Sequence, residues 1–137
     1  LFRCFKKVKG KDENVWFMQG NDLMTDPKSY RTGELSRHAI QAMEDSIVYS
    51  ISLRQMEDLC KTSHAFEHIC HVLTWEYYLK FMDYWDELTS GTVKQRYNRF
   101  LVLFPGLDGR ESVPVRHIAS LLKCSVRSLH RVRKSKR

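Results

Sequence analysis

The spacing of apolar residues changes along the chain and predicts strands in the first part and helices in the rest. Up to residue 52 the apolar residues come in short, partly alternating runs, which are typical of β-strands. Two of these runs flank a polar turn that contains Gly10, so they are expected to form a hairpin. Residues 22–35 contain Pro27 and Gly33 and are expected to be irregular. The predicted strands are residues 1–8, 15–19, 37–43 and 47–52, and the predicted shorter helices are residues 52–61 and 92–104.

The longest predicted helix runs from about His64 to Leu88 and carries two apolar stripes on opposite sides. A surface helix of a monomer needs one stripe, because only one side of it meets the core. The second stripe therefore predicts a second chain, paired through the same helix in a parallel, coiled-coil-like dimer. The alternative is a central helix buried within one domain. Spacing alone does not decide which stripe meets the partner. The predicted dimer interface consists of Phe66, Cys70, Leu73, Tyr77, Phe81 and Tyr84, and the opposite stripe consists of Val72, Trp75, Leu79 and Met82.

Residues 113–133 fit a helix-turn-helix, which is two short helices that cross over a small shared core. Pro114 stands where the first helix would start, and Ser125 is placed to cap the second helix. The turn commonly has a glycine in the left-handed conformation, and this chain has Lys123 there, at a cost of about 1 kcal/mol. The small residue at the crossing is Ala119, and the apolar core positions are Ile118, Leu122, Cys124, Leu129 and Val132.

The net charge of the chain, +7, is concentrated in this last segment. Residues 110–137 have nine Lys and Arg and one acid, a balance of +8, whereas residues 1–109 have fourteen Lys and Arg and fifteen acids, a balance of −1. A basic surface carried on helices suits a polyanion, most often DNA. Because one helix-turn-helix covers few base pairs, a dimer that reads two half-sites is expected.

The predicted DNA-binding surface is one outer face of the second helix with the basic residues next to it. Arg127, His130 and Arg131 share that face at helical spacing and are expected to contact base edges in a major groove. The alternative is a helical hairpin whose basic face is only solvated. The complete predicted surface is Val126, Arg127, His130 and Arg131, with Lys123, Lys134, Lys136 and Arg137 as phosphate-binding candidates.

Other chemistries have less support in the sequence. His64, His68 and His71 have the spacing of zinc ligands on one helix, which leaves a metal-responsive regulator as an alternative function. Cys70 points to the apolar stripe and no carboxylate completes the set, so neither a metal nor a cofactor is predicted. Motifs of phosphate-binding, serine or zinc-dependent enzymes are absent, and an enzyme is not expected. A non-regulatory nucleic-acid-binding module is a further alternative, although the basic tail has no aromatic residues to stack on RNA bases.

The cysteines and the hydropathy pattern favour a cytoplasmic protein without a membrane partner. No apolar run approaches the roughly 20 residues that span a bilayer, and no signal peptide is recognised at the start. The four cysteines are scattered and form no CxxC pair, which is unlike a disulfide framework and favours a reducing compartment. They are Cys4, Cys60, Cys70 and Cys124.

Several stretches together resemble one known family. They are Arg96-Tyr97, Phe100-Leu101, Phe104-Pro105 and residues 113–122, preceded by Gly20-Asn-Asp and residues 39–45. In this order they are similar to the Crp/Fnr family of bacterial transcription regulators, of the Bacteroidetes type. The resemblance implies an α+β fold with a partial β-barrel, a jelly roll like those that bind cyclic nucleotides, then a long dimerisation helix and a C-terminal helix-turn-helix domain. Because the chain begins within a strand, the N-terminal part of that barrel is expected to lie before residue 1.

The resemblance also bears on ligands and on the operator. In the members that bind cyclic nucleotides, a Gly-Glu pair precedes a phosphate-binding arginine. Here Gly33-Glu34 lies too close to Arg37, and Ser36 stands where that arginine would be, so cyclic-nucleotide binding is not expected. The family's base-contacting positions correspond to Val126, Arg127 and Arg131. Only Arg131 keeps its residue type, so the family's usual operator is not assumed.

The sequence therefore predicts a homodimeric, sequence-specific DNA-binding transcription regulator. RNA polymerase is a further candidate partner, and the effector is left open. The expected units are residues 1–62, a partial sensor barrel with a short helix; residues 63–90, the dimerisation helix; and residues 91–137, the DNA-binding domain.

Overall fold

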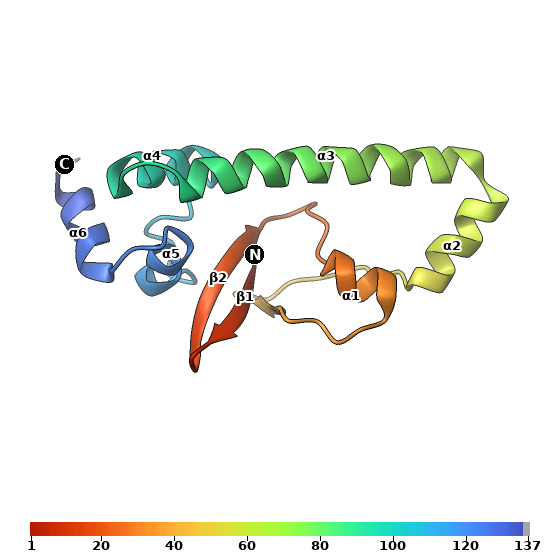
Figure 1. Ribbon diagram of the computed structural model, residues 1–137, viewed down its shortest axis with the longest axis horizontal. Coiled ribbons are helices and arrows are strands. Elements are labelled where there is room, and N and C mark those ends of the chain that lie inside the picture. The colour runs from red at the N-terminus through yellow and green to blue at the C-terminus, as the bar shows by residue number, and fades with distance from the viewer. Residues whose placement is uncertain (136–137) are drawn as a thin grey trace.

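A small antiparallel sheet and one long helix organise the structure, a computed structural model that describes residues 1–135 (Figure 1). β1 (Phe2–Val8) and β2 (Lys11–Met18) form the predicted hairpin, and β3 (Ala39–Ala42) pairs with β1 to give the order β2-β1-β3. Lys9 and Gly10 have φ angles of 49° and 76°, as a tight two-residue hairpin turn requires. β2 begins earlier than residue 15 because its polar residues also pair with β1, Glu13 standing opposite Lys6.

The sheet contradicts the expected partial β-barrel. No strand forms over residues 47–52, where Ile47 and Tyr49 are 89% and 98% exposed. The segment expected to be irregular contains α1 (Pro27–Thr32), which is capped by Asp26. Three strands, one of them only four residues long, are too few to close a barrel. A chain of 137 residues is also too small for a sensor barrel, a long helix and a helix-turn-helix domain, so the expected fold is wrong.

Two helices form an arm that extends from the sheet. α2 (Leu53–Thr62) and α3 (His64–Thr89) meet at Ser63, and α3 runs along most of the molecule (Figure 1). A reciprocal capping box of Ser52 and Gln55 starts α2, and the Ser63 hydroxyl accepts a hydrogen bond from the backbone N–H of Phe66 to start α3. These caps account for both helices beginning within one residue of the predicted positions.

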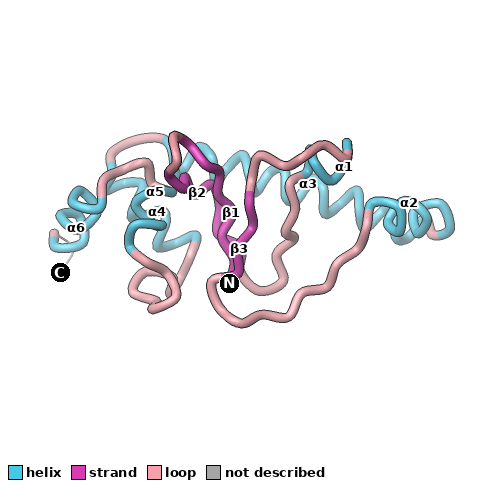
Figure 2. Tube along the Cα trace, turned by 90° about the horizontal axis from the view of Figure 1, so that it is seen from below, coloured by secondary structure: helices cyan, strands magenta, loops and turns pink. Residues whose placement is uncertain are grey.

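The last three helices gather at the other end of the molecule (Figure 2). α4 (Val93–Leu103) follows a turn at Gly91, whose φ is 81°, and begins with a second capping box. α5 (Val115–Leu121) and α6 (Val126–Lys134) come next, and the strands lie between this group and α2 (Figure 2).

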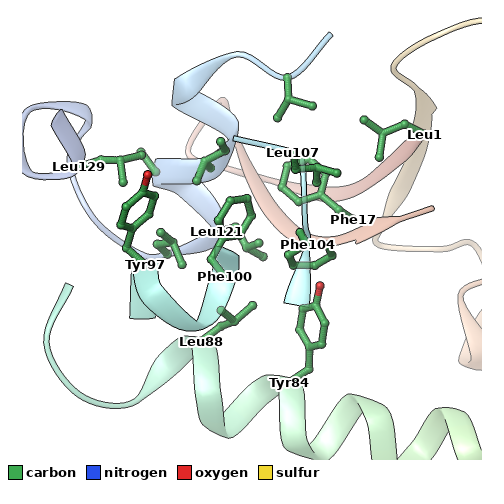
Figure 3. Close-up of a cluster of buried hydrophobic side chains, with 14 residues drawn as sticks. Leu1, Phe17, Tyr84, Leu88, Tyr97, Phe100, Phe104, Leu107, Leu121 and Leu129 are labelled. Atoms are coloured by element: carbon green, nitrogen blue, oxygen red, sulfur yellow. The ribbon is translucent and has the colours of Figure 1, made fainter. Parts of the chain in front are cut away.

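The buried core lies where the C-terminal part of α3 meets the sheet and these three helices (Figure 3). Phe17 of β2 is fully buried, and its ring packs edge-on against the rings of Phe100 and Phe104 from the α4 region. From α3 only Tyr84 and Leu88 are buried. The strands and the C-terminal helices therefore bury their apolar residues in one shared core.

Candidate nucleic-acid interface

Within residues 113–134 the structure has two short helices, α5 and α6, joined by residues 122–125. The backbone N–H of Cys124 donates to the carbonyl of Ala119 at 3.0 Å, which closes the end of α5 and directs the chain towards α6. Lys123 has a φ of 49°, so it adopts the left-handed conformation predicted for this position. Pro114 differs slightly from the expectation, because it is the residue before α5 and not the first residue within it.

The inner side of α6 fixes the helix on the core. Leu129 is fully buried, and Val132 packs against the same cluster. The Ser125 hydroxyl accepts a hydrogen bond from the backbone N–H of Ser128 at 3.0 Å, as predicted for the N-cap. A helix that is held in this way presents its opposite side in one fixed orientation.

One arginine of α6 is used inside the molecule. Arg133 forms an ion pair with Asp108, and the same carboxylate accepts a hydrogen bond from the Tyr97 hydroxyl. The sequence gives no sign of this, because Asp108 lies in the loop before α5 and 25 positions from Arg133. The pair ties α6 to α4 and to the loop that follows it.

The outer side of α6 presents the predicted DNA-binding residues to solvent. Arg127, Arg131 and Lys134 form no ion pair with any residue in the range 1–135, so their charges are available to an external anion. Two of the predicted phosphate-binding residues, Lys136 and Arg137, lie outside the described residues. The exposed residues on this side are Val126, Arg127, His130, Arg131 and Lys134.

Lys123, the remaining predicted phosphate contact, lies in the turn between the two helices. Its Nζ is 3.4 Å from Oε2 of Glu13 in β2, and both side chains are exposed. An exposed ion pair of this kind contributes at most about 1 kcal/mol. The Lys123 ammonium group can therefore exchange this carboxylate for a phosphate.

A buried polar cluster, which the sequence did not indicate, joins the sheet to α5. Arg3 donates from Nη1 to Asn14 Oδ1 at 3.1 Å and lies 2.8 Å from Asp12. Asn14 is 1% exposed and donates from Nδ2 to the carbonyl of His117 at 2.9 Å. Burial, reinforced by the neighbouring Arg3, lowers the pKa of His117 to about 4, so its ring is neutral at pH 7. More than a hundred positions separate His117 from Arg3 and Asn14, which is why no local pattern reveals the cluster.

The predicted dimer stripe of α3 lies on its inner side. Tyr84 stacks on Trp16 of β2 with ring centroids 3.9 Å apart, and Phe81 stacks on the same indole at 5.7 Å. The Tyr77 hydroxyl accepts a hydrogen bond from the backbone N–H of Leu23 at 2.7 Å. This stripe therefore contacts the chain's own sheet and the loop after it. Its other members, Phe66, Cys70 and Leu73, are half-buried.

The opposite stripe of α3 is exposed. Trp75 and Leu79, for example, are 54% and 57% exposed. Contiguous apolar surface of this kind marks interaction sites. We call this surface the outer face of α3; it consists of Ile69, Val72, Trp75, Tyr78, Leu79, Met82 and Trp85.

The histidines considered as alternative metal ligands are not assembled into a site. Among residues 1–135 no group of three or more His, Cys, Asp or Glu is placed to hold a metal ion. His71 accepts a hydrogen bond from the Trp75 indole N–H at 3.2 Å, and His64 lies 3.4 Å from Glu67. His64 and His71 therefore make their contacts with other residues of α3.

Within the described part of the chain, none of the helices combines the length and the apolar composition needed to cross a membrane. In comparisons with known proteins, no protein-family model matches this chain, and no curated protein or solved structure matches it either.

Proposed function

We propose that this chain binds duplex DNA sequence-specifically as a homodimer and regulates transcription in the bacterial cytoplasm. The observation that carries the proposal is the outer side of α6, where Arg127, Arg131 and Lys134 are exposed on a helix whose inner side is fixed on the core. A major groove admits an α-helix, and arginine reads guanine through two parallel hydrogen bonds. The resemblance of residues 96–105 and 113–122 to Crp/Fnr regulators supports the same function.

The positions of these side chains would separate the residues that read DNA bases from those that bind the phosphates of the DNA backbone. Arg127 and Arg131 lie one helical turn apart and would donate to guanine O6 and N7, while the methyl groups of Val126 fit against a thymine methyl. Lys123 precedes α6 and Lys134 ends it, so both would meet phosphates at the two edges of the groove. The α6 helix would thus lie in the groove with the side that carries Arg127 and Arg131 facing the bases.

The homodimer is proposed to form through the outer face of α3. Within this face Val72, Trp75, Leu79 and Met82 recur at three- and four-residue spacing, which is the pattern by which helices pair side by side. A second copy of the chain is the proposed occupant, because two half-sites on one duplex need two readers related by a two-fold axis. The α3 helix of the second copy would cover the outer face of α3 in the first copy with its own identical outer face.

Selection of bound duplexes from a random DNA pool tests the proposal. The purified chain is expected to enrich an inverted repeat with half-sites about one helical turn apart, or a multiple of it. In solution its molar mass should be twice 16.3 kDa.

The matched control is the double variant Arg127→Ala/Arg131→Ala, which leaves the core side of α6 unchanged and should enrich no sequence. Two results would contradict the proposal. One is binding without any sequence preference, and the other is a protein that stays monomeric while it binds.

A further inference from the structure

The β1–β2 hairpin lies against the C-terminal end of α5 and the turn that leads into α6. The backbone N–H of Asn14 donates to Ser120 Oγ at 2.9 Å, near the C-terminal end of α5. Glu13, the preceding residue, faces Lys123 in the turn that leads into α6. β2 therefore passes beside α5 and the start of α6, the helix proposed to enter the major groove.

The tip of this hairpin projects beyond α5. Closest to the tip, the Ser120 hydroxyl of α5 donates a hydrogen bond to the Asp12 carbonyl of β2 at 3.3 Å. Of β2, only Lys11 lies beyond this bond, next to the turn. A Cβ atom added to Gly10 would meet no atom within 4 Å, so the turn stands in open space. In Figure 1 the tip points away from α3 and extends past α5.

The exposed end of the hairpin is basic. The two acids near it are occupied, since Asp12 pairs with Lys7 at 2.5 Å and Glu13 pairs with Lys123. Lys9 and Lys11 are exposed and form no ion pair with any residue from 1 to 135. The charge of the tip is therefore uncompensated by the surrounding chain. The basic residues of the hairpin end are Lys6, Lys7, Lys9 and Lys11.

We propose that the hairpin tip binds the DNA backbone beside the groove that holds α6, with Lys9 and Lys11 as its phosphate-binding residues. This inference rests on the proposed function. A lysine ammonium group suits phosphate as a point charge, and contacts to phosphates set the position of a protein on the duplex without reading its sequence. Because the buried cluster around Asn14 joins the hairpin rigidly to α5, a contact at the tip would also set the angle at which α6 enters the groove.

The double variant Lys9→Gln/Lys11→Gln tests this, with a random-sequence duplex of about 30 base pairs, roughly three helical turns, as the probe. Each phosphate contact contributes about 0.9 to the slope of log affinity against log salt concentration, so the slope should become shallower by about 1.8 per protomer. At about 0.1 M salt the affinity should fall by more than about tenfold. The affinity for a selected duplex should fall by the same factor, because phosphates carry no sequence information.

Two control variants separate this contact from general electrostatics. Arg54→Gln/Lys61→Gln removes the same number of charges from exposed positions of α2, at the other end of the molecule, and should leave the slope unchanged. Lys9→Arg/Lys11→Arg keeps the charges and should bind as the unaltered chain does. The thermal unfolding of the three double variants is expected to match that of the unaltered chain, since the substituted side chains are exposed. Should Lys9→Gln/Lys11→Gln fail to fold, the single variants Lys9→Gln and Lys11→Gln are each expected to lower the salt slope by about 0.9.

The outcomes distinguish the hairpin contact from the proposed function itself. If the unaltered chain binds duplex DNA and the Gln double variant has the same salt slope, the hairpin inference is overturned and the proposed function stands. If the unaltered chain binds no duplex at all, both are overturned. A change in the preferred sequence with an unchanged salt slope would also overturn the inference, because it would place these lysines on bases.

Discussion

Arg3 Nη1 lies 3.2 Å from Nδ1 of His117, a residue 114 positions later in the chain. Arg3 is 5% and His117 8% exposed, so the contact joins the first strand to α5 inside the molecule. Because His117 is neutral, its ring nitrogen accepts a hydrogen bond from the guanidinium group. The first strand is thus a structural part of the unit that positions α6.

Stability is expected to fall as the pH decreases from about 6.5 to about 4. The pKa of His117 is lowered to about 4 in the fold by burial and by Arg3 and Arg116, whereas the unfolded chain has the ordinary value near 6.5. Between these values the unfolded chain binds a proton that the folded chain does not. The free energy of unfolding therefore decreases with falling pH, by at most about 1.4 kcal/mol per pH unit, which urea unfolding at several pH values measures.

The matched variant is His117→Gln, which keeps a hydrogen-bond acceptor but does not titrate. Its unfolding free energy should be nearly constant from about pH 6.5 to about pH 5.5, above the range in which carboxyl groups such as Glu44 titrate. Asp26 acts at lower pH, because hydrogen bonds from Ser36 and His38 lower its pKa to about 2, so its stabilisation is lost only as the pH falls from about 4 towards 2. An undiminished slope above pH 4 in the variant would refute the assignment to His117.

Removal of the Tyr84 hydroxyl is expected not to destabilise the fold. This hydroxyl is buried and has no hydrogen-bond partner within residues 1–135, and burial raises its pKa. Tyr84→Phe keeps the stacking on Trp16 and removes the unsatisfied group, so the free energy of unfolding should stay constant or rise by about 1 kcal/mol. Tyr84→Ala should lose about 3–5 kcal/mol. Chemical denaturation measures both, and a loss above about 1 kcal/mol in Tyr84→Phe would contradict the prediction.

Arg131→Ala is expected to relax DNA sequence preference. If Arg131 pairs with guanine through two hydrogen bonds, the variant should lose about 1–3 kcal/mol of discrimination at one base position. Competition between the selected duplex and its single-base variants measures this. Arg54→Ala, on the exposed side of α2, is the control and should bind normally. An unchanged preference in Arg131→Ala would reject the base contact, and an equal loss on all sequences would assign the residue to phosphate.

Leu79→Glu is expected to dissociate the proposed dimer while leaving each protomer folded. Leu79 is 57% exposed on the outer face of α3, so a carboxylate there meets solvent in the monomer but a like charge in the dimer. Light scattering should report half the mass, with unchanged helical circular dichroism. Leu73→Glu, on the half-buried inner side, should lower stability instead. A Leu79→Glu protein that remains dimeric would place the interface elsewhere.

Local signals are sufficient to predict the positions of the two short helices α5 and α6. Apolar spacing, the Ser125 cap and the small Ala119 all act within a few positions of one another, and so does the backbone conformation of Lys123. The hairpin is predicted for the same reason, since its strands are adjacent in sequence. In such segments, residues that are close in sequence make the contacts that determine the local structure.

Contacts between segments that are far apart in the sequence cannot be predicted from such local signals. Periodicity groups Tyr84 with Phe81 on one side of α3 but does not reveal that Trp16 covers that side. The alternating pattern around Tyr49 suggests a strand, yet a strand needs a neighbour to pair with, and the fold gives it none in the described residues. The basic hairpin tip is likewise hidden when charge is summed over residues 1–109, because the fifteen acids of that range offset its lysines.

The confinement of the buried α3 residues to Tyr84 and Leu88 makes the molecule thermodynamically uneven. The preceding turns of the helix have no buried residue, so we expect their amide hydrogens to exchange with solvent through local opening. We expect the amide hydrogens around Phe100 and Leu129 to exchange only when the whole molecule unfolds, because both side chains are fully buried. The core around Phe100 and Leu129 is therefore expected to be rigid, and the N-terminal turns of α3 are expected to be flexible. A partner that binds to those turns would also make them more rigid.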